Sequence, residues 1–115
     1  MQTRTELVLG EIDLAELKQA LVRLRVENEA DVAQARITLN ALTSDNSIGS
    51  ALLQQTAENA EYMIADALGI IALVDAAFDR MEIGNYGTCT VCREPIPLER
   101  LQLRPYGMTC VPCNS

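Results

Sequence analysis

Residues 89–113 decide the fold of this chain: Cys89-Thr-Val-Cys92 is followed by seventeen residues and then by Cys110-Val-Pro-Cys113. These are the only four cysteines among 115 residues, and the chain contains no histidine. The pattern C-x2-C-x17-C-x2-C has the spacing of a four-thiolate zinc site, in which each close pair presents two sulfurs from one tight turn. Because four sulfurs complete a tetrahedral shell, we expect one structural Zn²⁺ on these cysteines and no catalytic metal.

Three other uses of the cysteines compete with zinc. Two disulfides need an oxidising compartment, and the N-terminal sequence has no signal-peptide pattern. A redox-active dithiol needs a βαβ context and leaves the second pair unexplained. A four-thiolate iron site of the rubredoxin type has the same geometry. We favour zinc, whose binding contributes about 10–16 kcal/mol to folding and so supplies the extra stability that a chain this short needs.

Two stretches of helical periodicity lie upstream of the cysteines. Asp13-Leu-Ala-Glu16 has the form of a capping box that opens the first. Its apolar positions are Leu14, Leu17, Leu21, Leu24, Val32, Ala35, Leu39 and Leu42. Those of the second are Leu53, Ala57, Ala60, Ile64, Ala67, Ile71, Val74 and Phe78. A cluster of turn formers at 43–50 separates the stretches, and Gly84 ends the second, so we predict an antiparallel helical hairpin.

The expected fold is therefore mainly α: a long antiparallel hairpin of the coiled-coil type, followed by a small C-terminal four-cysteine zinc ribbon. We divide the chain into an N-terminal segment 1–12, a hairpin 13–84 with its turn near 44–50, and a zinc finger 85–115. Asn28 falls in line with Leu14 and Leu21 and is expected to fix the helix register. Gly69, inside the second helix, predicts close packing or a kink.

Charge and composition exclude several classes of function. The chain has 9 basic and 16 acidic residues and a net charge of −7, which disfavours direct DNA binding. Without histidine there is no hydrolytic triad, and nothing outside the cysteines supplies a nucleophile, so we expect no enzyme. The longest uncharged run within the apolar stretch 62–78 is Ala67–Val74, too short to span a bilayer. We expect a soluble, cytoplasmic protein.

The distal half of the hairpin is purely acidic. Between Ile37 and Asp79 there is no lysine or arginine, whereas six positions are acidic: Asp45, Glu58, Glu61, Asp66, Asp75 and Asp79. A solvated acidic face is the ordinary explanation of such a run. The functional alternative is a hairpin tip that enters a basic or metal-containing site of a partner.

The zinc segment carries more than its cysteines. Tyr86, Gly87, Ile96, Arg100, Leu101 and Pro105 stand around the four cysteines without a gap in the spacing of a known family. The segment resembles the DksA/TraR zinc-finger family, in which the finger directly follows a long helical hairpin. The resemblance implies a regulator that inserts its hairpin into the secondary channel of RNA polymerase, where acidic residues at the tip act near the active site.

The chain departs from the family pattern at two places. The tip motif of the family, D-x2-D-x-A, aligns so that it ends at Ala51, which puts Asn46 and Gly49 at the two acidic positions and Asp45 one place away. We take Asp45, Asn46 and Gly49 as the candidate partner-binding tip. Arg93 replaces the glycine after the second cysteine, which predicts a different or strained turn.

Three arginines near the finger have two interpretations. Arg100 and Arg104 are expected to act locally, on Glu94, Glu99 or a cysteine sulfur, with partner contact as the alternative. Arg80 is expected at a solvated helix end, with contact to the polymerase as the alternative. The competing function is a zinc-stapled interaction module that forms a homodimer through the apolar face Tyr62–Phe78.

Overall fold

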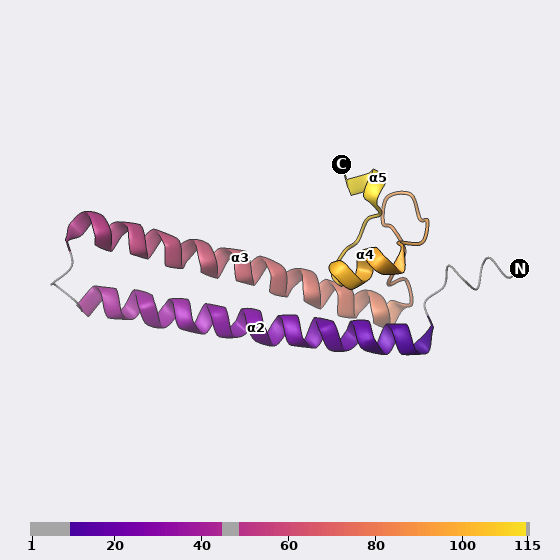
Figure 1. Cartoon of the computed structure of the whole chain (residues 1–115), viewed down its shortest axis with the longest axis horizontal. Helices are drawn as coiled ribbons and strands as arrows, with labels where there is room; N and C mark the ends of the chain where they lie inside the picture. Colours follow the sequence, from indigo (N-terminus) through magenta and orange to yellow (C-terminus); the bar gives the residue numbers. More distant parts are fainter. Residues whose placement is uncertain (1–9, 45–48, 115) are drawn as a thin grey trace, which may run out of the picture. The chain divides into compact units, whose positions relative to one another are not determined.

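A computed structural model describes residues 10–44 and 49–114 (Figure 1). Two long helices, α2 (Glu11–Ser44) and α3 (Ser50–Ile83), are followed by the short helices α4 (Leu98–Leu103) and α5 (Val111–Asn114). Within the described ranges there is no β-strand, only an isolated antiparallel bridge between Thr88 and Pro95. The predicted fold class is confirmed: two long helices pack together, and a four-cysteine cluster follows them.

The predicted boundaries can be compared with the helix ends. Helix α2 begins at Glu11, two residues before the predicted capping box, and its first hydrogen bond runs from the N–H of Leu14 to the carbonyl of Gly10 (3.0 Å). Helix α3 ends at Ile83, and Gly84 follows with φ 98°, in the left-handed region that glycine adopts without strain. The N–H groups of Gly84 and Asn85 both donate to the carbonyl of Arg80. Most of the predicted turn, including Asp45 and Asn46, lies outside the described residues.

The chain divides into two compact units. The described residues of Arg25–Ala72 form one, here called the helix-pair unit. Those of Met1–Leu24 and Leu73–Ser115 form the other, here called the finger unit. No helix in either set of described residues is long and apolar enough to cross a membrane.

The helix-pair unit has a narrow seam built largely from small side chains. Val32 and Ala35 of α2 and Ala60 and Ala67 of α3 are buried, as the apolar periodicity predicts. Asn28 shares this seam and is only 9% exposed, in keeping with the predicted register role.

The close packing predicted for Gly69 is wrong. This glycine is exposed, α3 is continuous from Ser50 to Ile83, and a Cβ atom built on Gly69 would have no neighbour within 4 Å. No close contact therefore requires a glycine at this position.

The finger unit is assembled from the start of α2, the end of α3 and the cysteine-rich segment. Its buried apolar residues include Leu17 and Leu21 of α2, Val74 and Ala77 of α3, and Ile96 and Leu101 of the finger. Three predicted apolar positions of this unit are less buried: Leu14 is 36% exposed, and Leu24 and Phe78 are half-buried. Leu14 and Phe78 both line an open groove between α2 and α3.

Candidate metal centre

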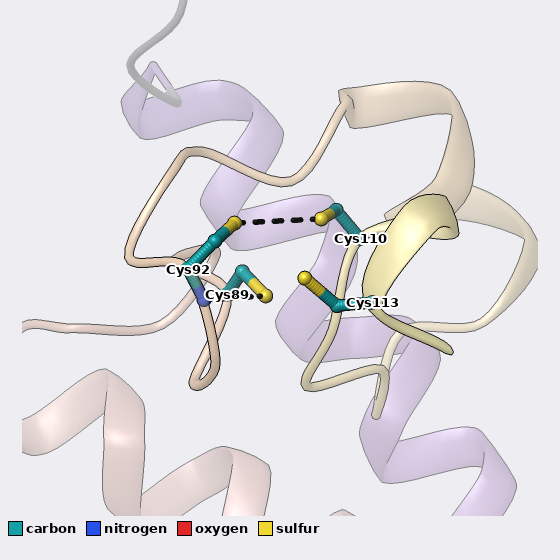
Figure 2. A group of neighbouring side chains, drawn as sticks. All are labelled: Cys89, Cys92, Cys110 and Cys113. Carbon is teal, nitrogen blue, oxygen red and sulfur yellow. Dashed lines mark hydrogen bonds between the residues drawn. The ribbon is translucent and has the colours of Figure 1, made fainter. Parts of the chain in front are cut away.

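The four cysteines converge on one point from two separate turns (Figure 2). Their Sγ atoms all lie within 4.8 Å of one another, and those of Cys92 and Cys110 are 3.6 Å apart. A tetrahedron with metal–sulfur bonds of about 2.3 Å has edges of about 3.8 Å, so the sulfurs already stand near the corners that Zn²⁺ requires. All four cysteines are free thiols, so the structure has neither of the two disulfides considered from the sequence.

The first cysteine pair is held by a tight turn. The N–H of Cys89 donates to the carbonyl of Glu94 (2.8 Å), and the N–H of Arg93 donates back to the carbonyl of Cys89 (3.0 Å). Closing this turn puts Arg93 at φ 66°, the only non-glycine residue with positive φ in the described ranges. The strain predicted at this position is confirmed. The N–H groups of Val91 and Cys92 point at Cys89 Sγ, at 3.4 and 3.5 Å.

The second pair lies at helix α5, where the N–H of Cys113 donates to the carbonyl of Cys110 (3.2 Å). The two turns are tied together by the N–H of Thr90, which donates to the carbonyl of Met108 (2.9 Å). This backbone hydrogen bond links the two turns that carry the sulfur pairs.

The thiols have unequal acidities in the metal-free protein. The backbone N–H of Cys92 lowers the pKa of Cys89 to about 6, with smaller contributions from other backbone donors. The hydrogen-bonded side chain of Cys110, together with burial, raises the pKa of Cys113 to about 12. The backbone therefore favours the thiolate of Cys89, whereas the neighbouring thiol favours the protonated form of Cys113, whose proton a bound Zn²⁺ would displace.

Arg100 supports the second turn. Its Nε donates to the carbonyl of Thr109 (3.0 Å), the residue before Cys110. The predicted local role therefore exists, although the acceptor is a backbone carbonyl and not a sulfur or a glutamate. Arg104 is exposed, and its guanidinium lies 6.0 Å from the centroid of the Tyr106 ring.

Arg80 corrects the sequence interpretation. It is only 9% exposed, not at a solvated helix end, and its NH2 donates to the carbonyl of Gly107 (3.1 Å). Its Nε and NH1 are buried without a hydrogen-bond partner among the described residues, and burial lowers its pKa. The guanidinium lies over the ring of Tyr86, whose hydroxyl donates to the carbonyl of Pro105 (2.8 Å). Arg80 and Tyr86 thus hold the loop that leads to the second cysteine pair.

The sequence analysis identified Tyr86 only as part of a motif and did not predict its contact with Arg80. The two residues are six positions apart, with the end of α3 between them, so no helical periodicity relates them. The remaining tip candidate, Gly49, lies in the helix-pair unit, where its carbonyl accepts the N–H of Leu53 (2.9 Å). It is exposed and carries the first turn of α3.

Comparison with known families identifies this centre. Residues 84–115 match the family described as prokaryotic dksA/traR C4-type zinc finger. The finger segment is therefore similar to the DksA/TraR zinc fingers. The predicted resemblance is confirmed, and the four-sulfur donor set fits the structural Zn²⁺ expected for a C4 finger, which Cys89, Cys92, Cys110 and Cys113 would hold.

A solved structure shares the fold of this chain. The chain is similar to the transcription factor DksA2 from Pseudomonas aeruginosa with a TM-score of 0.82 and 24% sequence identity, over 91% of this chain and 82% of that one. No curated protein sequence matches the chain significantly.

Proposed function

We propose that this protein is a non-enzymatic, cytoplasmic transcription regulator that binds RNA polymerase by inserting its hairpin into the secondary channel. The DksA/TraR zinc finger at residues 84–115 carries the proposal. The fold adds support, because the similar structure is that of a transcription factor. In this proposal the zinc centre is structural and the hairpin makes the functional contact.

The charge of the hairpin agrees with such a contact. A segment without a basic residue from Ile37 to Asp79 suits a site that holds metal ions and basic side chains. We place the contact at Asp45, Asn46 and Gly49, with the exposed Arg104 and the half-buried Arg100 as further candidates. Because Arg80 is buried, we assign it to the support of the finger and not to the partner.

Binding to core RNA polymerase tests the proposal directly. We expect the zinc-loaded chain to bind at low salt and to be displaced by a ligand known to occupy the secondary channel. Asp45→Ala should weaken the effect on transcription, whereas Asp66→Ala, which removes the same charge from an exposed site on α3, should not. Absence of binding, or binding that the competitor does not displace, would contradict the proposal.

A second candidate function is an interaction module in which zinc staples a helical scaffold that forms homodimers. The observation in its favour is the exposure of large apolar side chains on α3 at Tyr62 (73%), Met63 (49%) and Leu68 (45%). Tyr62→Asp should then abolish self-association through the face Tyr62–Phe78. Direct DNA binding is not part of either function, and a gel shift with a salt-dependent complex would overturn that expectation.

A further inference from the structure

An apolar groove lies on the surface of the finger unit, and the residues that line it are distant from the cysteines along the chain. It has a volume of about 620 Å³ and is lined by Leu14, Ala15 and Val22 of α2 and by Phe78 and Met81 of α3. Leu14 is 36% and Val22 48% exposed, so apolar side chains face solvent along the groove. Nothing in the proposed polymerase contact at the hairpin tip uses this surface.

The groove borders a ridge of the same helix. Ala15, Lys18 and Val22 line both this groove and a second one of about 480 Å³, which continues to Gln19 and Arg23. A ridge of α2 therefore stands between two hollows of comparable size. Helices associate by packing the ridge of one into the groove of the other, and here one surface offers both parts.

The charges around the groove are arranged with opposite signs at its two ends. Glu11 and Glu82 line the end at the start of α2, and Lys18 lines the groove seven residues further along. Seven residues are two turns of helix, so Glu11 and Lys18 lie on the same face about 10 Å apart. Turned by a two-fold axis near Leu14 and Ala15, a second copy would place its Lys18 opposite Glu11, and its Glu11 opposite Lys18.

We propose that this groove is a self-association site, in which two copies of the chain pack α2 against α2 in antiparallel orientation. The two-fold arrangement makes the surface complementary to itself, as a symmetric dimer interface requires. It brings the Leu14 side chains of the two copies together near the axis and pairs both lysines, whereas a parallel arrangement would set like charges against each other. This interface uses only the Phe78 end of the face Tyr62–Phe78.

The molar mass of the zinc-loaded full-length chain in solution tests the proposal. Sedimentation equilibrium at concentrations up to about 1 mM should show a shift from 12.6 kDa towards twice that mass. Leu14→Asp should weaken association at least about tenfold, and Tyr62→Asp, an equally polar change on exposed α3 surface, should leave it unchanged. Helix content and zinc stoichiometry must stay constant in both variants.

Exchanging the two charges distinguishes this antiparallel dimer from non-specific association. Lys18→Glu alone should dissociate the dimer, because it places glutamates opposite each other. Adding Glu11→Lys to Lys18→Glu restores opposite charges across the two-fold axis and should restore the dimer. A wild-type chain that stays monomeric at about 1 mM, a dimer lost through Tyr62→Asp and not Leu14→Asp, or a failure of the double variant to re-associate would each overturn the proposal.

Discussion

The guanidinium of Arg80 lies 5.8 Å from the centroid of the Tyr86 ring, and both side chains hold the same loop. Arg80 donates to the carbonyl of Gly107 and Tyr86 to that of Pro105. This loop leads directly to Cys110, so a residue of α3 and a residue of the finger together position the second cysteine pair. The arrangement explains why Arg80 is buried near the end of α3 although two of its nitrogens have no hydrogen-bond partner in the described part of the chain.

Substitution of Arg80 should separate its packing from its hydrogen bond. Arg80→Met keeps an apolar stem over Tyr86 but loses the bond to Gly107, so we expect a loss of about 1 kcal/mol in the free energy of unfolding. Arg80→Ala also leaves a cavity and should cost about 2–3 kcal/mol. Arg36→Ala, at an exposed position of α2, should stay within about 0.5 kcal/mol of wild type in denaturant unfolding. Equal effects at Arg80 and Arg36 would contradict the supporting role.

The buried hydroxyl of Tyr86 predicts a loss of stability at alkaline pH. Burial raises its pKa to about 12 from the ordinary value of 10, and Arg80 partly opposes the shift. The folded state therefore favours the neutral phenol. The contribution of Tyr86 to the free energy of unfolding is complete below pH 10 and is lost as the pH rises towards 12. Tyr86→Phe should lose about 1 kcal/mol at neutral pH with the bond to Pro105.

Denaturant titrations of wild type and Tyr86→Phe at several pH values test this. The stability difference between them should shrink from pH 10 upward, because only the wild type has a phenol to ionise at this position. A difference that stays constant over this range would show that Tyr86 does not titrate with the fold. Other ionisable groups are common to both proteins and cancel in the comparison.

Replacement of Arg93 by glycine should stabilise the first cysteine turn. Arg93 has φ 66°, a conformation that costs an L-residue about 1–2 kcal/mol, of which the greater entropy of unfolded glycine offsets about half. Arg93→Gly should therefore raise the free energy of unfolding by about 0.5–1 kcal/mol. Arg93→Ala removes the same side chain but retains the strain, and should stay near wild type. Thermal unfolding of the two zinc-loaded variants tests the difference, and equal behaviour would rule out backbone strain.

Gly69 in α3 is the reverse case: here the replacement of a glycine should stabilise the protein. It is exposed, with open space where a methyl group would stand, so Gly69→Ala removes only the conformational cost of glycine in a helix. We expect about 1 kcal/mol of added stability. Gly107→Ala is the matched contrast, because its Cβ would lie 3.1 Å from the carbonyl oxygen of Arg104 and should destabilise the finger. A loss of stability in Gly69→Ala would mean that the glycine has a role which its surroundings do not show.

The difference between Gly69 and Arg93 shows what the sequence could determine. The cysteine spacing predicted the metal centre because the ligands are set by local turns, and the missing glycine at 93 correctly predicted strain. Apolar periodicity predicted the helices. It could not predict whether a given position on a helix, such as Gly69 or Leu14, packs against another element or faces solvent. The burial of Arg80 depends on the path of the loop at 104–107, and no local pattern in the sequence records that path.

Removal of zinc should unfold the finger, while much of the helix-pair unit remains helical. Among the described residues, one backbone hydrogen bond, from Thr90 to Met108, joins the two cysteine turns when the metal is removed. Cys89→Ser or Cys110→Ser should therefore release the finger, since structural zinc contributes about 10–16 kcal/mol to such folds. The seam of Val32, Ala35, Ala60 and Ala67 contains no ligand and should keep its helices.

Hydrogen exchange resolves the two units in one experiment. In Cys89→Ser, or after chelation of zinc, the amide of Arg93 should lose protection, whereas amides of α2 and α3 within Arg25–Ala72 should stay protected. Thr90→Ser, a neighbouring change that leaves every ligand in place, should exchange like wild type. Addition of Zn²⁺ after chelation should restore protection in the finger. If chelation changes neither the exchange of the finger nor the melting of the chain, the metal has no structural role. If it exposes both units together, the helix pair depends on the finger for its own stability.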